Sequence, residues 1–238
     1  AILAKNEQLR ANLLRSISHD LRTPLTSISG NAGILLSNGD TLKPEKKQQL
    51  YSDIYDDALW LINLVENLLA VTKIEEGSMH LKMSAELMDE VITEALHHVN
   101  KKKDEHTIKV VQTEDFILAK MDARLIVQVI INIVDNAIKY TPTGSTITIS
   151  TTKKDKQVIV DIADDGPGIP DQAKERIFDM FYIAPNEVVD SHRSLGLGLA
   201  LCKSIINAHG GEISVLDNKP KGTVFRFTLP AEEVNLYE

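Results

Sequence analysis

The chain has 238 residues, 43% of them hydrophobic, which is enough for one large domain or two small ones. Its net charge of −8, with no long basic run, argues against nucleic acid as the main partner. The single cysteine, Cys202, excludes an internal disulfide framework and suits a reducing cytosol. No stretch of the sequence approaches the length of a membrane span, and no signal peptide opens it.

Residues 1 to about 37 predict one long helix, which the run 38–40 should end. Its apolar residues stand in helical register at Ile2, Leu9, Leu13, Ile17, Leu21, Leu25, Ile28 and Leu35. Pro44 opens a second helix that should stop at Gly77. This helix carries two apolar rows: Leu50, Ile54, Ala58, Leu61, Val65, Leu68 and Thr72, then Tyr51, Tyr55, Ile62 and Leu69. Because one hairpin cannot bury stripes this wide, we expect two copies to pair as a homodimeric four-helix bundle.

The first helix carries a potential nucleophile, His19, directly followed by Asp20. A neighbouring carboxylate can hold the imidazole in one tautomer and accept its proton, so that the other ring nitrogen is free to attack. Thr23 lies on the same face one turn later, and Pro24 should weaken the helix enough to act as a hinge. For an isolated His–Asp pair, the alternative is an ordinary surface histidine on a helix.

From residue 78 the pattern changes to short alternating runs interleaved with helices, which predicts an α+β fold, a sandwich of one mixed sheet with helices on one side. The expected strands are 79–83, 107–111, 116–121, 146–152, 158–163, 212–216 and 224–229, and the expected helices are 87–100, 123–140, 172–178 and 199–209. Residues 182–195 have no periodicity and predict a long functional loop.

Polar residues gather on one side of the helix predicted at 123–140. Asn132, Asn136, Lys139 and Tyr140 fall three, four and seven residues apart, among isoleucines and valines. Two asparagines in such surroundings need partners, and Mg²⁺ with phosphate oxygens would supply them. A solvated helix face is the alternative, and it fits the lysine better than the asparagines.

Two glycine-containing runs follow. In the run 164–170, Asp164 ends a strand and could accept the exocyclic amine of adenine, while Gly166 and Gly168 let the backbone close over the base. Taken alone, this run could be an ordinary turn. In the run 195–200, glycine N–H groups at a helix N-terminus would bind phosphate, although no P-loop lysine follows.

The run Ser18–Leu25 resembles the phosphoacceptor box of the two-component sensor histidine kinases. The three clusters, in this order, with the run 176–181 between the second and third and Gly222-Thr223 before the last strand, resemble the ATP-binding domain of the histidine kinase, gyrase, Hsp90 and MutL superfamily. Within that family, the runs 18–26 and 209–211 look most like the Kdp-type potassium-sensor kinases.

The resemblance implies a phosphotransfer hairpin at 1–77 and a catalytic ATP-binding domain at 78–238. His19 would take the γ-phosphoryl group of ATP and pass it to an aspartate of a response regulator receiver domain, and Thr23 would position water in the reverse, phosphatase reaction. Asn136 would hold Mg²⁺. The residues implied to bind the nucleotide are Asn132, Asn136, Lys139, Tyr140, Asp164, Gly166, Gly168, Ile169, Phe181, Arg193, Gly196, Leu197, Gly198, Leu199 and Thr223. The chain would be the cytoplasmic part of a longer bacterial protein that reaches the inner membrane through a missing N-terminal region.

Three positions separate the rival activities. Gyrase-type ATPases place a glutamate, the base for attacking water, where this chain has Asn132, so transfer to a protein nucleophile is favoured over an ATP-hydrolysing clamp. Ile183 stands where the family commonly has arginine, and Ser194 where it often has glycine. Either Arg193 replaces that arginine from the loop or turnover is slow, and these departures support the third alternative, a non-catalytic dimeric scaffold that binds nucleotide.

Overall fold

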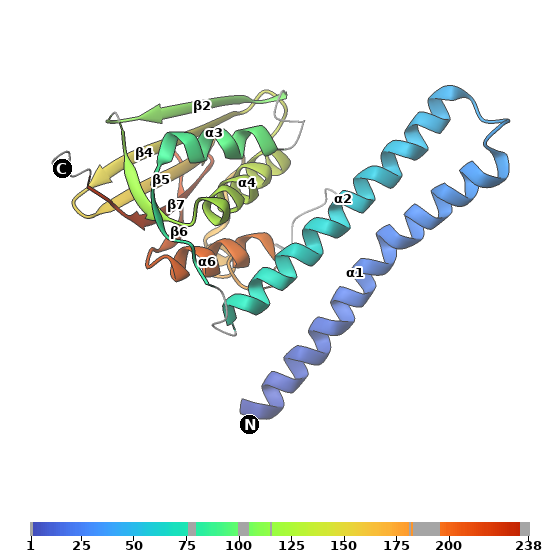
Figure 1. Cartoon of the computed structure of the whole chain (residues 1–238), viewed down its shortest axis with the longest axis horizontal. Coiled ribbons are helices and arrows are strands. Elements are labelled where there is room, and N and C mark those ends of the chain that lie inside the picture. The colour runs from blue at the N-terminus through green and yellow to red at the C-terminus, as the bar shows by residue number, and fades with distance from the viewer. Residues whose placement is uncertain are drawn as a thin grey trace. The chain divides into compact units, whose positions relative to one another are not determined.

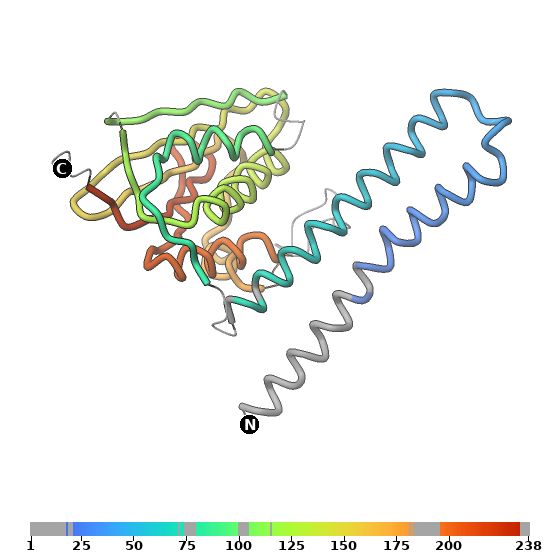
Figure 2. The backbone as a smooth tube through the Cα atoms, in the orientation of Figure 1, coloured from blue at the N-terminus to red at the C-terminus, as the bar shows by residue number. Residues whose placement is uncertain are grey.

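The computed structural model describes residues 2–75, 80–99, 105–114, 116–180, 182 and 196–233, without the side chains of 2–17, 19, 20, 71, 74 and 75. Residues outside this description, and those whose side chains it omits, are grey in Figure 2. The chain divides into two compact units, a hairpin unit containing residues 1–69 and a sandwich unit containing residues 70–184 and 196–238.

The hairpin unit is made by two long helices, α1 (Ile2–Asn38) and most of α2 (Pro44–Glu75), which run antiparallel (Figure 1). The Thr41 and Leu42 amides donate to the Asn38 carbonyl at 3.0 and 3.2 Å, which closes the connecting turn. α1 continues without a break through Pro24, which is buried. The prediction of one long helix to about residue 37 is therefore confirmed, and the role of Pro24 as a hinge stays a prediction.

One side of α2 presents an apolar stripe to solvent, formed by Tyr51, Tyr55, Leu59, Ile62, Val65 and Leu69. These six side chains are between 41% and 63% exposed, and their spacing of three or four residues keeps them on one face. A different row of α2, which includes Leu50 and Leu64, is buried within the unit. Packing within one hairpin therefore leaves the stripe uncovered.

The sandwich unit is built on a five-stranded sheet of order β2-β4-β5-β7-β6. Its strands are β2 (Thr107–Gln112), β4 (Thr146–Lys154), β5 (Gln157–Asp164), β6 (Ile213–Asp217) and β7 (Thr223–Pro230). β2 pairs with β4 in parallel, and every other pair is antiparallel. Alternate residues of the central strands are buried, as expected for a sheet covered on one face.

A second, two-stranded sheet pairs β1 (Ser84–Leu87) with β3 (Leu118–Met121), and Ser84 is opposite Met121. The prediction of one sheet for all strands is therefore wrong. The strand expected at 79–83 is also misplaced, because the described residues 80–83 form no strand and pairing begins at Ser84. Local alternation cannot show which run of residues will find a partner strand.

The helices α3 (Met88–His98), α4 (Ala123–Tyr140) and α6 (Gly198–Ala208) lie on one face of the five-stranded sheet (Figure 1). Isoleucines, valines and leucines from these helices and from the sheet form the core between the two layers. α4 begins and ends where its apolar periodicity predicts. The sequence therefore predicts the bounds of the helix that carries Asn132 and Asn136.

The helix expected at 172–178 is shorter than predicted. α5 spans only Asp171–Lys174, and residues 175–178 form turns. In this segment the Asp179 amide donates to the Arg176 carbonyl at 2.8 Å, a spacing of three residues that tightens the chain. The tighter path lets Phe178 pack edge-on against Phe225, with ring centroids 6.3 Å apart.

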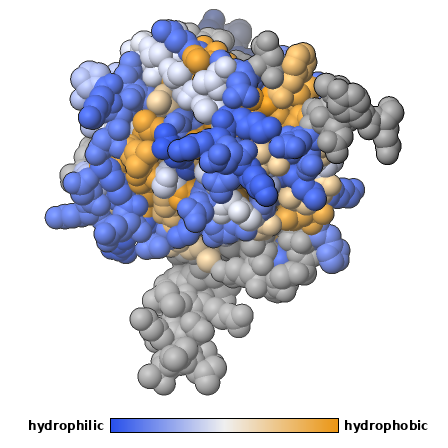
Figure 3. Space-filling view, turned by 90° about the vertical axis from the view of Figure 1, so that its left-hand side faces the viewer, coloured by the Kyte–Doolittle hydropathy of each residue, from blue (hydrophilic) through white to orange (hydrophobic). Residues whose placement is uncertain are grey.

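The face of the molecule in Figure 3 is largely hydrophilic, with hydrophobic residues interspersed. Among the described residues of the sandwich unit, the large apolar side chains that are exposed are Val110, Val111, Phe116, Met180 and Leu216. None of the helices in the described part of the chain has the length and hydropathy needed to cross a membrane.

Candidate functional site

A buried carboxylate, Asp164, ends the central strand β5. The alternation of β5 turns this side chain to the buried face, where it is 7% exposed. Its Oδ1 accepts hydrogen bonds from the amides of Gly166 at 2.9 Å and Thr223 at 3.2 Å. No residue in the described part of the chain donates to Oδ2. The site therefore contains an oriented carboxylate with one oxygen open to a ligand donor.

The pKa of Asp164 is raised above its ordinary value of 3.8, mainly because burial removes water from the charged form. The hydrogen bonds from Gly166 and Thr223 lower it, and the neighbouring charge of Asp165 raises it. A ligand donor at Oδ2 would relieve part of the cost of burying this charge.

Glycines allow the backbone to close around Asp164. A side chain at Gly222 would clash with the Asp164 carbonyl oxygen, and Gly222 has a φ of 116°, which L side chains rarely adopt. A Cβ at Gly166 would lie 2.6 Å from Cγ2 of Thr141. Both positions therefore require glycine, because neighbouring atoms of the protein approach the backbone closely there.

Thr141 and His106 form a further part of this site that the sequence predictions did not assign. The Thr141 hydroxyl donates to the Ala137 carbonyl at 2.7 Å and accepts from Nε2 of His106 at 3.0 Å. Thr141 directly follows the helix that carries the asparagines, and this position could have suggested it. His106 lies 35 residues earlier in the sequence, and no motif there indicates a role.

The predicted polar side of α4 is present. Asn132, Asn136, Lys139 and Tyr140 are all half-buried among fully buried apolar residues, and the Lys139 ammonium lies 4.9 Å from the centre of the Tyr140 ring. The Nδ2 group of Asn132 is buried and donates to no nitrogen or oxygen among the described residues; the Cys202 sulfur near it is only a weak acceptor. An unsatisfied buried donor is costly and rare, and phosphate oxygens would satisfy this one.

The N-terminus of α6 lies next to Asn132. A Cβ placed on Gly198, the first residue of α6, would lie 3.8 Å from Cγ of Asn132. Leu197 is buried just before the helix, Leu199 packs on the core, and no side chain caps the first amides. Gly196 has a φ of 62°, which turns the chain into the helix. The side-chain amide of Asn132 and the uncapped backbone N–H groups at the start of α6 together provide hydrogen-bond donors suited to phosphate.

Two clusters form among the predicted site residues that the structure describes. One joins Asp164, Gly166 and Thr223 through hydrogen bonds, and the other joins Asn132 to Gly198. Gly168, with a φ of 83°, lies beside Gly222, and Ile169 packs on the core. Phe181, Ile183, Arg193 and Ser194, together with the rest of the predicted 182–195 loop after Tyr182, lie outside the described residues.

No group of three histidine, cysteine, aspartate or glutamate side chains that could hold a metal occurs within the described ranges. That fits Mg²⁺, which binds through one or two protein oxygens and keeps water and phosphate as its other ligands. Asn136 carries a side-chain carbonyl oxygen of this kind, one helical turn from Asn132.

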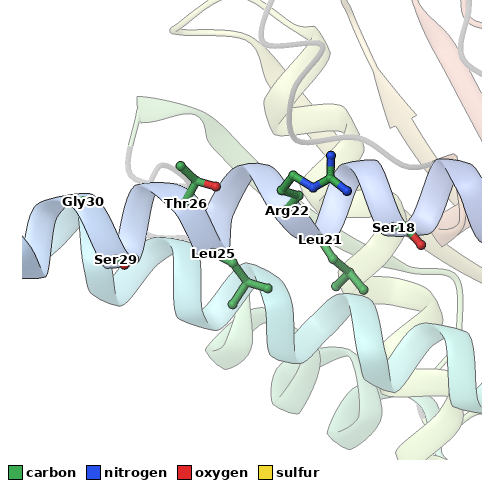
Figure 4. Close-up of a pocket in the computed structure, with 7 residues that line it drawn as sticks. All are labelled: Ser18, Leu21, Arg22, Leu25, Thr26, Ser29 and Gly30. Carbon is green, nitrogen blue, oxygen red and sulfur yellow. The ribbon is translucent and has the colours of Figure 1, made fainter.

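His19 and Asp20 lie on α1, although their side chains are outside the described set. Thr23 is exposed one turn further along α1. Beside these positions Leu21 and Leu25 point to the side on which α2 runs, and Arg22 and Thr26 point away from it (Figure 4). A shallow hollow follows this part of α1 and is lined by Ser18, Leu21, Arg22, Leu25, Thr26, Ser29 and Gly30.

The fold and the site define a nucleotide-binding ATPase domain that follows a long helical hairpin. Comparison with known families agrees: residues 9–77 match the His Kinase A (phospho-acceptor) domain, and residues 121–233 match the histidine kinase-, DNA gyrase B- and HSP90-like ATPase. The chain belongs to the sensor histidine kinases of two-component systems. The resemblance predicted from the sequence is confirmed.

Individual relatives support the family assignment. The sensor protein KdpD of Clostridium acetobutylicum is 47% identical over 96% of this chain, and KdpD of Escherichia coli K12 is 34% identical over 96%. The chain spans about a quarter of the length of each. The catalytic domain of histidine kinase ThkA is 30% identical and superposes with a TM-score of 0.55, covering 63% of this chain and 95% of that domain. ThkA in complex with the response regulator protein TrrA covers 96% of this chain and 64% of that one, with 26% identity and a TM-score of 0.68.

Proposed function

We propose that this chain autophosphorylates His19 from Mg-ATP and passes the phosphoryl group to an aspartate of a response regulator receiver domain. The observation that carries the proposal is the pairing, in one chain, of a phosphoacceptor helix with a site whose free groups match ATP. Those groups are the acceptor Oδ2 of Asp164 and the donor Nδ2 of Asn132. The complex of ThkA with the response regulator protein TrrA supports a response regulator as the partner.

Each group has a defined part in the transfer. Asp164 accepts a hydrogen bond from the adenine amine, while the first amides of α6 and Nδ2 of Asn132 bind the phosphate oxygens. Asn136 would hold Mg²⁺, and the bound ion would supply positive charge beside the phosphates. Asp20 orients the His19 imidazole and takes its proton. A nitrogen–phosphorus bond forms at His19, and the bond from the γ-phosphorus to the bridging oxygen breaks with release of ADP.

Asn132 is the residue that favours phosphoryl transfer to His19 over hydrolysis of ATP. An amide cannot remove a proton from water, so the site lacks a general base at the position where the clamp ATPases have glutamate. Incubation with γ-labelled ATP distinguishes the alternatives. A kinase yields acid-labile label on the protein, a clamp yields free phosphate, and a scaffold binds nucleotide without transfer.

Thr23 is proposed to position water for dephosphorylation of the partner regulator. It is exposed on α1, four residues after His19 and therefore on the same side. We expect Thr23→Ala to keep autophosphorylation within about twofold of wild type, because the hydroxyl takes no part in attack on ATP. Release of phosphate from a phosphorylated receiver domain should fall about tenfold or more, because an unpositioned water reacts slowly. Loss of autophosphorylation in this variant would contradict the role.

The apolar stripe on α2 supports a homodimer. Its six side chains form a continuous exposed face that water covers in the single hairpin. Pairing two hairpins would bury these faces, at about 25 cal/mol per Å² less the cost of association. We therefore propose a four-helix bundle as the dimer interface.

Sedimentation tests that interface. Residues 1–77 should form a stable dimer, and residues 78–238 a monomer that binds ATP. In the whole chain, Ile62→Glu places a charge in the apolar stripe and should raise the dimer dissociation constant by about 100-fold or more, since an unpaired charge is costly to bury. Asn63→Glu introduces the same charge at the next, exposed position outside the stripe and should leave the dimer intact. A monomeric hairpin fragment would place the interface elsewhere.

The sensing part of the protein is proposed to lie outside this chain. The chain covers 25% of KdpD, and the ATP that the site fits is a cytosolic metabolite. We propose that it is the cytoplasmic part of a longer bacterial sensor anchored in the inner membrane.

A further inference from the structure

The imidazole of His209 links the two helices that form the phosphate side of the nucleotide site. His209 follows the last residue of α6 and is only 3% exposed. Its Nε2 accepts the backbone N–H of Asp122 at 3.0 Å, and Asp122 is the residue that precedes α4. Its Nδ1 lies 2.7 Å from the Ile205 carbonyl oxygen. Because a backbone N–H can only donate, Nε2 carries no proton, and Nδ1–H donates to Ile205.

Three contacts connect α6 to the first half of α4. The contact between Asp122 and His209 lies at one end. In the middle, the Cys202 thiol lies 3.8 Å from the Val129 carbonyl oxygen. At the other end, Gly198 lies beside Asn132.

These contacts describe one antiparallel register. The distance along the axis of α4 from Asp122 to Asn132 is about 15 Å, at about 1.5 Å per residue. The distance along the axis of α6 from His209 to Gly198 is about 16 Å by the same rise, so the two spacings match. The hydrogen bond at His209 therefore opposes any slide of α6 that would separate Gly198 from Asn132.

We propose that His209 is a positioning residue for the nucleotide site. It sets the axial register of α6 on α4, and thereby the separation between the α6 amides and Nδ2 of Asn132. The inference rests on the proposed function, because those groups are assigned to the phosphates of ATP. The middle contact is a weak thiol hydrogen bond and tolerates sliding, since a thiol is a weak donor. The hydrogen bond from Asp122 is directional and does not.

Two substitutions of His209 distinguish its hydrogen bond with Asp122, which precedes α4, from its hydrogen bond with Ile205 within α6. The amide of asparagine ends at the level of Nδ1, so His209→Asn can keep the bond to Ile205 but cannot reach Asp122. The amide of glutamine ends at the level of Nε2, so His209→Gln can offer its oxygen to the Asp122 N–H. Glutamine also fills one methylene more than asparagine, so His209→Met serves as the space-filling control, because methionine has the length of glutamine but only a weakly accepting sulfur. A purely space-filling role predicts that the Met variant binds ADP as the Gln variant does, whereas the register role predicts that it weakens binding as the Asn variant does.

The test is calorimetric titration of the whole chain with ADP in the presence of MgCl₂. We expect His209→Asn to raise the dissociation constant about tenfold, which corresponds to one lost hydrogen bond. His209→Gln should stay within about threefold of wild type. The matched control, His97→Asn, changes an exposed histidine of α3 and should bind as wild type does. Equal weakening by the Asn and Gln variants, or wild-type affinity in His209→Asn, would overturn the inference while leaving the proposed function intact. Absence of ADP binding by the wild-type chain would overturn both.

A second measurement needs no variant. The ¹⁵N chemical shifts of His209 in the folded wild-type chain should show a neutral ring protonated at Nδ1. A ring protonated at Nε2 could not accept the Asp122 N–H, and its observation would refute the inference.

Discussion

His19→Gln should abolish acid-labile labelling by γ-labelled ATP. Glutamine keeps much of the bulk of histidine but removes the ring nitrogen that attacks phosphorus, and the sequence of α1 contains no second histidine. The dissociation constant for Mg-ADP should stay within about twofold of wild type, because the nucleotide is bound by the sandwich unit. The expected effect is thus complete loss of transfer with binding retained.

A matched histidine makes this experiment specific. His97 is exposed on α3, and His97→Gln makes the same chemical change away from α1. This control should be labelled at the wild-type rate. Persistent acid-labile label on the His19→Gln protein would show that another residue is the phosphoacceptor, whereas loss of nucleotide binding would show that the substitution disturbs the fold.

Asp164→Asn is expected to cause the largest loss of nucleotide affinity. The substitution is nearly isosteric, and the amide oxygen can still accept from Gly166 and Thr223. The amide N–H₂ then stands where Oδ2 was, so a donor faces the donor of the adenine amine. We expect the dissociation constant for Mg-ADP to rise about 100-fold, or about 2.7 kcal/mol, by calorimetric titration.

The same substitution should stabilise the nucleotide-free fold at neutral pH. Because burial raises the pKa of Asp164, the folded chain binds its proton more tightly than the unfolded chain does. The stability this group contributes is fully present below its unfolded pKa of about 3.8, and it is lost as the pH rises through the folded pKa. At pH 7 the charged carboxylate is therefore unfavourable in the empty site, and asparagine removes that cost.

Denaturant unfolding at several pH values checks this expectation. Asp164→Asn should unfold at a higher denaturant concentration than wild type at pH 7, and the difference should shrink as the pH falls toward the unfolded pKa. Asp165→Asn is the matched control, because Asp165 accepts the Thr146 amide at the surface of the same loop and is less buried. It should retain nucleotide affinity. Lower stability of the Asp164→Asn protein together with unchanged ADP binding would show that this carboxylate supports the fold and not the ligand.

The pattern of apolar and polar residues along the sequence determined the bounds of several elements of this protein and the side of each that is buried. The apolar periodicity of α4 predicts both of its ends, because a helix that covers a sheet repeats its buried side every three or four residues. The alternation of β5 places Asp164 on the buried side at the strand end for the same kind of reason. The site residues that stand in contiguous runs, such as Asp164 and Gly166, could therefore be proposed from the sequence.

Contacts between distant residues were decided only by tertiary structure. Thr223 bonds Asp164 across 59 positions, His106 bonds Thr141 across 35, and His209 bonds the Asp122 amide across 87. β1 likewise became a strand at Ser84 because β3 pairs with it there, and not where its own residues alternate. Periodicity encodes which side of an element is buried, but it does not encode which partner lies across the interface. Hydrogen bonds between elements depend on that partner, and they orient the carboxylate and set the helix register in this site.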